Sequence, residues 1–179
     1  MPTVIAHAAV PLALGWALGP RKVSGRLLAA GVLAAMLPDA DVVAFKLGIA
    51  YADAFGHRGT SHSIVFALAV GALGALASHW LRAPPLWAAL WLALCTLSHP
   101  LLDACTNGGL GVALLWPWSD ARWFAPWRPI AVSPIGAGFF SLRGLRVLWS
   151  EALWVWLPLL ALAAPWALLR ARRTPEPAR

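Results

Sequence analysis

The chain of 179 residues is 60% hydrophobic and only 12% charged, with a mean hydropathy of +0.71. Soluble domains carry about 25% charged residues, so this composition excludes an ordinary soluble protein and indicates a membrane protein. The net charge of +7 does not indicate nucleic-acid binding, because basic residues such as Arg21 and Lys22 flank apolar segments, as membrane orientation signals do.

Five apolar segments predict an all-α, polytopic bundle of about five transmembrane helices in a single domain, residues 1–179. Each segment approaches the roughly 20 residues that a helix needs to cross a bilayer. The segments comprise residues 2–18, 27–45, 63–81, 86–104 and 147–169. The second is the weakest prediction, because Pro38, Asp39 and Asp41 interrupt it. In the third, Ala67 and Gly71 share a face of small residues that permits close helix packing.

Residues 106–146 form a long connection, rich in proline, glycine and tryptophan, that is not typical of a simple span. Its tryptophans indicate the headgroup layer of a membrane, which accommodates both an apolar ring and a polar N–H. An aromatic substrate groove is the alternative interpretation. The clustered residues are Trp116, Trp118, Trp123 and Trp127.

The basic residues predict the orientation of the chain. The first basic pair, Arg21 and Lys22, follows the first apolar segment, which is the opposite order to a secretory signal. We therefore expect a retained first span with its N-terminus outside the cytoplasm. The segments then placed inside, residues 19–26, 82–85 and 170–179, hold eight of the 14 Lys and Arg residues, as the positive-inside rule favours.

In this topology, four histidines and three aspartates converge on the outer face of the membrane. These residues are His7, Asp39, Asp41, His57, His62, His99 and Asp103. Only His79 falls at the opposite end. Ionisable groups near membrane spans are costly and indicate function. His99 and Asp103 are four residues apart and therefore share one face of a helix.

Each part of this set also has a purely structural explanation. His99 and Asp103 could form a hydrogen bond that locks two helices together. Asp39 and Asp41 could cap a helix end or mark a turn. Residues 57–63 could form a loop whose Thr60 or Ser61 caps the next helix. The convergence of all seven side chains on one face favours a metal site over these separate explanations.

Imidazole and carboxylate groups predict a divalent metal, with zinc expected and manganese or iron as alternatives. Such metals deprotonate a bound water molecule to hydroxide near neutral pH. Two such ions would suit a displacement reaction at phosphorus, because they hold both the attacking and the leaving oxygen. There are more candidate ligands than one ion binds, so one to three ions are expected. Alternatively, the surplus residues orient the ligands through hydrogen bonds. The predicted ligands are His7, Asp39, His57, His62, His99 and Asp103.

Four further residues are candidates for catalysis or substrate contact. Asp41 is either another ligand or the base that activates water. Arg58 is expected to bind a phosphate oxygen through bidentate hydrogen bonds, with a lipid headgroup contact as the alternative. Thr106 and Asn107 are expected to line the substrate site. A zincin-type protease is excluded, because the sequence has no His-Glu-x-x-His motif.

The candidate residues also occur in motifs of fixed order. His7 is followed by an apolar stretch and then by three motifs. They are Leu37-Pro38-Asp39-Ala40-Asp41, His57-Arg58-Gly59-Thr60-Ser61-His62-Ser63 and His99-Pro100-Leu101-Leu102-Asp103-Ala104-Cys105-Thr106-Asn107-Gly108-Gly109. In residues 1 to about 135, the chain resembles the LexA-regulated, inner-membrane-bound, metal-dependent hydrolases of bacteria. It departs at Ala6, where that family often has threonine, which affects a hydrogen-bonding neighbour of His7 rather than the ligand itself.

The resemblance implies a metal-dependent hydrolase of the bacterial inner membrane. The cluster is similar to that of zinc-dependent phospholipase C and P1-type nucleases, which are helical phosphodiesterases. This similarity implies a phosphoester or phospholipid substrate at the periplasmic membrane surface, with the lipid bilayer as partner. The alternative is a non-catalytic metal-binding membrane protein, such as a transporter or structural factor. A transporter is expected to place ionisable groups near the bilayer midplane, whereas here they gather towards one end.

Overall fold

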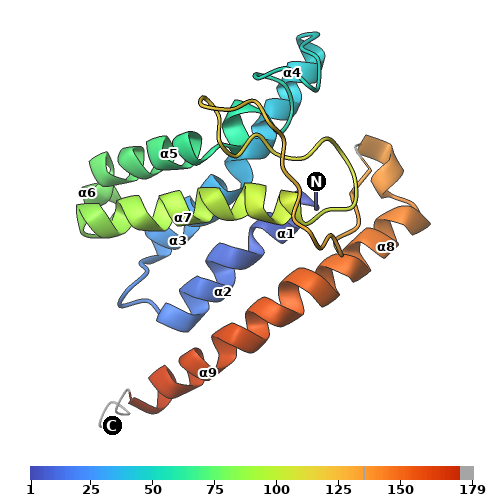
Figure 1. The fold of residues 1–179 in the computed structure, drawn as a ribbon. Helices are drawn as coiled ribbons and strands as arrows, with labels where there is room; N and C mark the ends of the chain where they lie inside the picture. The colour runs from blue at the N-terminus through green and yellow to red at the C-terminus, as the bar shows by residue number, and fades with distance from the viewer. Residues whose placement is uncertain (135, 174–179) are drawn as a thin grey trace.

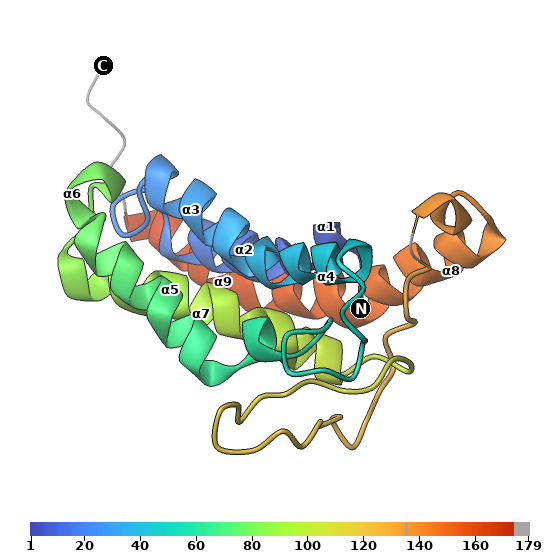
Figure 2. The same ribbon diagram turned by 90° about the horizontal axis from the view of Figure 1, so that it is seen from above.

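The computed structural model describes residues 1–134 and 136–173, which form an all-α structure as predicted. Long helices lie alongside one another, and an irregular connection passes over one end of them (Figures 1 and 2). Over these two ranges, β-structure is limited to isolated bridges that pair Thr106 with Ile130 and Val112 with Trp123.

Each predicted apolar segment coincides with helical structure. The helices are α1 (Val4–His7) with α2 (Ala9–Leu18), α3 (Gly25–Met36), α5 (Ile64–Leu76) with α6 (Ser78–Leu81), α7 (Pro85–Ala104) and α9 (Leu157–Arg173). In the described part of the chain, three helical stretches are long and apolar enough to cross a membrane: Gly25–Lys46, Pro85–Ala104 and Leu142–Arg173. Val4–Leu18 and Ile64–Leu76 are apolar but shorter, so the five-span topology stays a prediction.

The interruption of the second span has a defined structure. After α3, the chain tightens into the 3-10 turn η1 (Leu37–Val42) before the short helix α4 (Val43–Lys46). Pro38, near the start of this turn, lacks the N–H that would continue an α-helical ladder. The turn buries the Asp39 side chain, so the residues that weaken the span also position a carboxylate inside the bundle.

The connection after α7 is irregular up to the short turn η3 (Gly136–Phe139), so it is not a simple span, as expected. The last helix begins earlier than expected, at Leu142 rather than residue 147. It runs through α8 (Leu142–Glu151), a π-helical turn η4 (Ala152–Trp156) and α9. Trp127 in the connection is exposed and packs edge to face on Trp154, with the ring centroids 4.8 Å apart.

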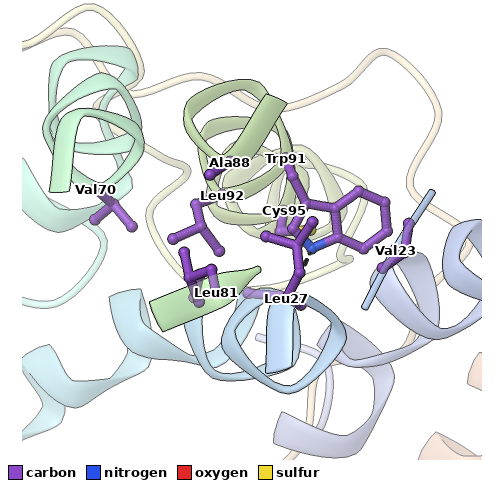
Figure 3. Packing of buried hydrophobic residues seen from close by; sticks show 10 residues of the cluster. Val23, Leu27, Val70, Leu81, Ala88, Trp91, Leu92 and Cys95 are labelled. Carbon is purple, nitrogen blue, oxygen red and sulfur yellow. Dashed lines mark hydrogen bonds between the residues drawn. The ribbon is translucent and has the colours of Figure 1, made fainter. Parts of the chain in front are cut away.

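The core forms where α3 and α5 pack against α7 (Figure 3). Trp91 is a buried member of this core, and its indole N–H donates a 3.0 Å hydrogen bond to the Leu27 carbonyl. A Cβ on Gly71 would lie 2.8 Å from the Ala89 carbonyl oxygen, and a Cβ on Gly74 would lie 2.9 Å from that of Ala88. The predicted small-residue face therefore does bring two helix backbones close together.

The helix α9 lies along α2 and is otherwise little covered (Figure 1). Leucines such as Leu162 and Leu168 are largely exposed. Exposed leucines along a long apolar helix are expected for a surface that faces lipid.

Candidate metal centre

Four predicted ligands come together in one buried cluster. One donor atom from each of Asp39, His62, His99 and Asp103 lies within 4.8 Å of the donor atoms of the other three. Asp39 comes from η1, His62 from the 3-10 turn η2 (Thr60–His62), and the other two from the last part of α7. Three segments that are distant in the sequence thus build the cluster.

The distances between donor atoms suit a shared ion. His62 Nε2 lies 3.1 Å from His99 Nε2 and 3.2 Å from Asp103 Oδ2. His99 Nε2 lies 3.3 Å from Asp39 Oδ1. Ligands that bind a tetrahedral zinc ion at its usual bond lengths are about 3.3 Å apart.

Several polar atoms of the cluster are buried without a hydrogen bond in the described part of the chain. They include both carboxylate oxygens of Asp39, Oδ1 of Asp103 and both ring nitrogens of His7. Such atoms are costly to bury unless a partner compensates them. A divalent cation would compensate them, because each is a metal donor. The residues present therefore fit a bound metal.

His7 is placed to serve as a fifth donor. Its Nε2 lies 3.9 Å from Asp39 Oδ2 and 3.9 Å from Asp103 Oδ1, too far for a hydrogen bond to either. Its ring stacks on that of His99, with the centroids 3.6 Å apart and the planes 11° from parallel. His7 thus lies against the cluster.

His99 is held in the orientation that a metal ligand requires. Its Nδ1 lies 2.7 Å from the Ala35 carbonyl oxygen, which can only accept a hydrogen bond. The ring therefore carries a proton on Nδ1, and when it is neutral its Nε2 lone pair points into the cluster. Ligating histidines usually donate their other N–H to a carbonyl or carboxylate in this way.

Asp41 and His57 form a second layer, outside the four-residue cluster. Asp41 Oδ1 lies 2.5 Å from His57 Nδ1, and Asp41 Oδ2 lies 3.2 Å from His62 Nδ1. Asp41 Oδ2 also accepts hydrogen bonds from the Ser61 hydroxyl, at 2.6 Å, and from the Arg58 backbone N–H, at 3.0 Å. Asp41 therefore orients His62 while His57 lies behind it.

The two carboxylates beside His62 determine its protonation. Burial opposes the charged ring, but hydrogen bonds with Asp103 and Asp41 outweigh burial and raise the pKa of His62. Without a metal ion, the ring therefore stays protonated to a higher pH than an ordinary histidine does. Below that raised pKa, an incoming ion displaces a proton.

Arg58 is fully buried and contacts Asp103 directly. Its Nε lies 2.9 Å from Asp103 Oδ2, and its two terminal nitrogens donate to the Gly108 carbonyl and the Thr106 hydroxyl, each at 3.1 Å. Arg58 thus balances the Asp103 charge and attaches α7 to the loop after it. Two of its five N–H groups are left by these contacts, so substrate binding by Arg58 stays a prediction.

Thr106 and Asn107, the predicted substrate-lining residues, both take part in loop contacts. The buried Thr106 hydroxyl donates a 2.7 Å hydrogen bond to the Asp103 carbonyl. The Asn107 side chain accepts a 3.0 Å hydrogen bond from the Val132 N–H. Their contact with substrate stays a prediction.

Glu151 was missed by sequence reasoning. It is buried in α8, where it accepts hydrogen bonds from the Thr3 backbone N–H and, at 2.7 Å, from the Thr3 hydroxyl. Thr3 in turn caps α1 by accepting a bond from the Ala6 N–H, next to His7. A lone carboxylate inside an apolar span was the available indication, because such a charge is costly without a partner.

Two cavities lie beside the cluster. One has a volume of about 370 Å³, and Asp39 is part of its wall, which is otherwise mainly apolar and includes Pro2, Ile5, Val42 and Phe139. The other has a volume of about 230 Å³ and is lined in part by Asp41 and Ser61.

His79 lies exposed in α6, at the far end of α7 from the cluster (Figure 1). It does not contribute to the donor set, in agreement with the predicted topology. It therefore provides a matched control for substitutions of the clustered histidines.

Comparison with known proteins identifies relatives along nearly the whole chain. The profile of the YdjM inner membrane protein family matches residues 1–174. Inner membrane protein YbcI of Escherichia coli (strain K12) is 52% identical over 160 residues, which is 88% of this chain and 92% of that protein. Inner membrane protein YdjM of Escherichia coli (strain K12) and of Shigella flexneri is 38% identical over 109 residues, 54% of this chain and 50% of each relative. No solved structure matches.

Proposed function

We propose that this chain, which belongs to the YdjM inner membrane protein family, is a metal-dependent hydrolase of phosphoesters. The observation that carries the proposal is the buried cluster of His and Asp donors, several of which have no hydrogen-bonding partner in the described residues. Like the other members of this family, the chain is an inner membrane protein.

Asp39, His62, His99 and Asp103 would hold the ion, with His7 as a further donor. A bound divalent metal would lower the pKa of a water molecule towards neutrality and polarise a phosphoryl oxygen. Arg58 holds Asp103 in place, and the Ala35 carbonyl holds His99. Asp41 borders the smaller cavity and, with its partner His57, is the candidate acceptor for a proton released from water.

The larger cavity supports a substrate that is partly apolar. Asp39 brings the donor cluster to its wall, while Ile5, Val42 and Phe139 offer apolar surface. A phospholipid joins a phosphoester to an apolar chain and would use both features. By the positive-inside rule, the substrate would be reached from the periplasmic face of the membrane.

A non-catalytic metal site is the second candidate. His7, His62, His99 and Asp103 are each fully buried, as expected for a closed structural site without an open position for substrate. Such a site would still bind metal, so metal content and hydrolysis must be measured separately.

The test is metal analysis of the purified, detergent-solubilised protein alongside its His99→Ala and Asp103→Ala variants, with His79→Ala as the control. We expect stoichiometric metal in the wild type and the control and a loss of most of it in the two cluster variants. The same four proteins are then screened for hydrolysis of a soluble phosphodiester and of phospholipid. Unchanged metal content in both cluster variants would falsify the metal site. Bound metal with no hydrolysis of either class would support the non-catalytic alternative.

A further inference from the structure

A basic cavity lies at the opposite end of the bundle from the metal centre, between α2 and α9. It has a volume of about 640 Å³. Its lining includes four basic residues, Arg21, Lys22, Arg170 and Arg173, together with the apolar Leu14, Leu18, Trp166 and Leu169. A neighbouring cavity of about 560 Å³ shares Leu18, Arg21 and Lys22 and extends to Pro84 and Trp87 before and within α7. The name basic cavity is used below for the first of these, the one lined by Arg21, Lys22, Arg170 and Arg173.

The positive charge of this cavity has little local compensation. Arg21, Lys22 and Arg173 are exposed, and none of the three forms an ion pair with a carboxylate within residues 1–134 and 136–173. The acidic residues of those two ranges lie in η1, the loops, the end of α7 and α8. Within the residues that the structure describes, an anionic ligand would therefore meet several cations and no nearby acid.

Arg170 is fixed in the wall of this cavity. Its side chain donates hydrogen bonds to the Trp16 carbonyl, at 3.0 Å, and to the Ala17 carbonyl, at 3.4 Å. These carbonyls belong to the last turn of α2, where the helix dipole favours a cation. Gly19 has φ +77° and permits the approach, because a Cβ there would lie 2.5 Å from the Arg170 guanidinium carbon. The chain thus positions this cation where α2 ends.

We propose that the basic cavity binds an anionic phospholipid, with the headgroup phosphate between Arg21, Lys22 and Arg173. The apolar wall formed by Leu14, Leu18, Trp166 and Leu169 would contact an acyl chain. Free phosphate would leave that wall without a partner. Basic pockets between transmembrane helices on the cytoplasmic side are suited to anionic headgroups, and the predicted orientation places this end there. The proposal is independent of metal binding and hydrolysis.

The test is native mass spectrometry of the full chain in detergent, titrated in turn with phosphatidylglycerol, phosphatidylcholine and inorganic phosphate. The variant is Arg21→Gln with Lys22→Gln. The matched control is Arg143→Gln with Arg146→Gln, which removes the same charge from exposed positions in α8. Metal content and thermal unfolding, measured on all three proteins, establish that each is folded.

We expect the wild type and the control to bind phosphatidylglycerol in preference to phosphatidylcholine. The Arg21/Lys22 variant should bind phosphatidylglycerol about 30-fold more weakly, from the usual contribution of two basic residues near an anionic headgroup. Equal weakening in the control would show a general effect of charge and overturn the proposal. Displacement of the lipid by an equal concentration of inorganic phosphate would overturn it as well, because the site would then recognise the anion alone.

Discussion

At the end of the bundle where α7 terminates, charged side chains are buried and contact one another, whereas at the end where α9 terminates they are exposed and line a cavity. In the metal centre, Asp103 contacts Arg58 and His62, and each of these has further partners. Removing one member leaves another buried charge uncompensated. The exposed cations of the basic cavity have water as a substitute partner, so their losses should be small and nearly additive. Substitution of a charged residue should therefore cost more stability at the buried metal centre than at the exposed basic cavity.

The largest effect is expected from Arg58→Met, which removes the guanidinium beside Asp103. A buried carboxylate that loses its partner typically costs about 3–5 kcal/mol of stability. The loss should be smaller in metal-loaded protein, because the ion also compensates Asp103. Unfolding is to be measured with and without added metal. If the variant is as stable as the wild type both with and without metal, the two ends of the bundle do not differ in the cost of losing a charge.

A smaller effect is expected from Glu151→Ala, which frees Thr3 and the turn that carries His7. Loss of a group that orients a ligand typically weakens metal affinity by about 10- to 100-fold. Glu151→Gln should recover part of the affinity, because its amide oxygen still accepts a hydrogen bond. Metal titration of both variants checks this. If alanine and glutamine behave alike and bind metal as the wild type does, Glu151 has no positioning role.

The two ends should also respond differently to pH. Because contacts with Asp103 and Asp41 raise the pKa of His62, the protonated ring predominates below that raised pKa and competes with metal. Metal affinity should therefore fall as pH falls, by about tenfold per unit for each proton displaced. Lipid binding at the basic cavity should not follow this change between pH 8 and 5, because His62 lies at the other end of the bundle. Parallel titrations at both pH values test the contrast.

The smallest effect is expected from Arg173→Gln, at an exposed position of the basic cavity. Surface substitutions of this kind leave stability nearly unchanged. Metal content should equal that of the wild type, because the cluster lies at the other end of the bundle. A loss of metal in this variant would reveal coupling along α9 that the contacts do not predict.

The parts of the structure that sequence reasoning predicted are those that depend on local pattern. Runs of apolar residues indicate helices whatever their neighbours are, and the placement of histidines at helix ends indicated which residues could meet. Asp39, His62, His99 and Asp103 were accordingly among the predicted ligands and do meet.

The parts that were missed depend on contacts between distant residues. Glu151 lies 148 residues from Thr3, so no local pattern links them. The contact between His57 and Asp41 likewise depends on how the loop before α5 folds back, and the role of His57 as a ligand stays a prediction. The division of the predicted span 63–81 into two helices, with α5 ending at Leu76, was not evident from its apolar composition either.

The hydrogen bonds from Thr3 to Glu151 join the first turn of the chain to its last long helix. During synthesis at the ribosome, all the donors of the cluster are translated before Glu151. Before Glu151 is translated, the chain therefore contains every donor of the cluster but not the carboxylate that binds Thr3 at the start of α1. A chain that stops before α8 therefore carries all the donors but cannot form the hydrogen bonds that join Thr3 to Glu151.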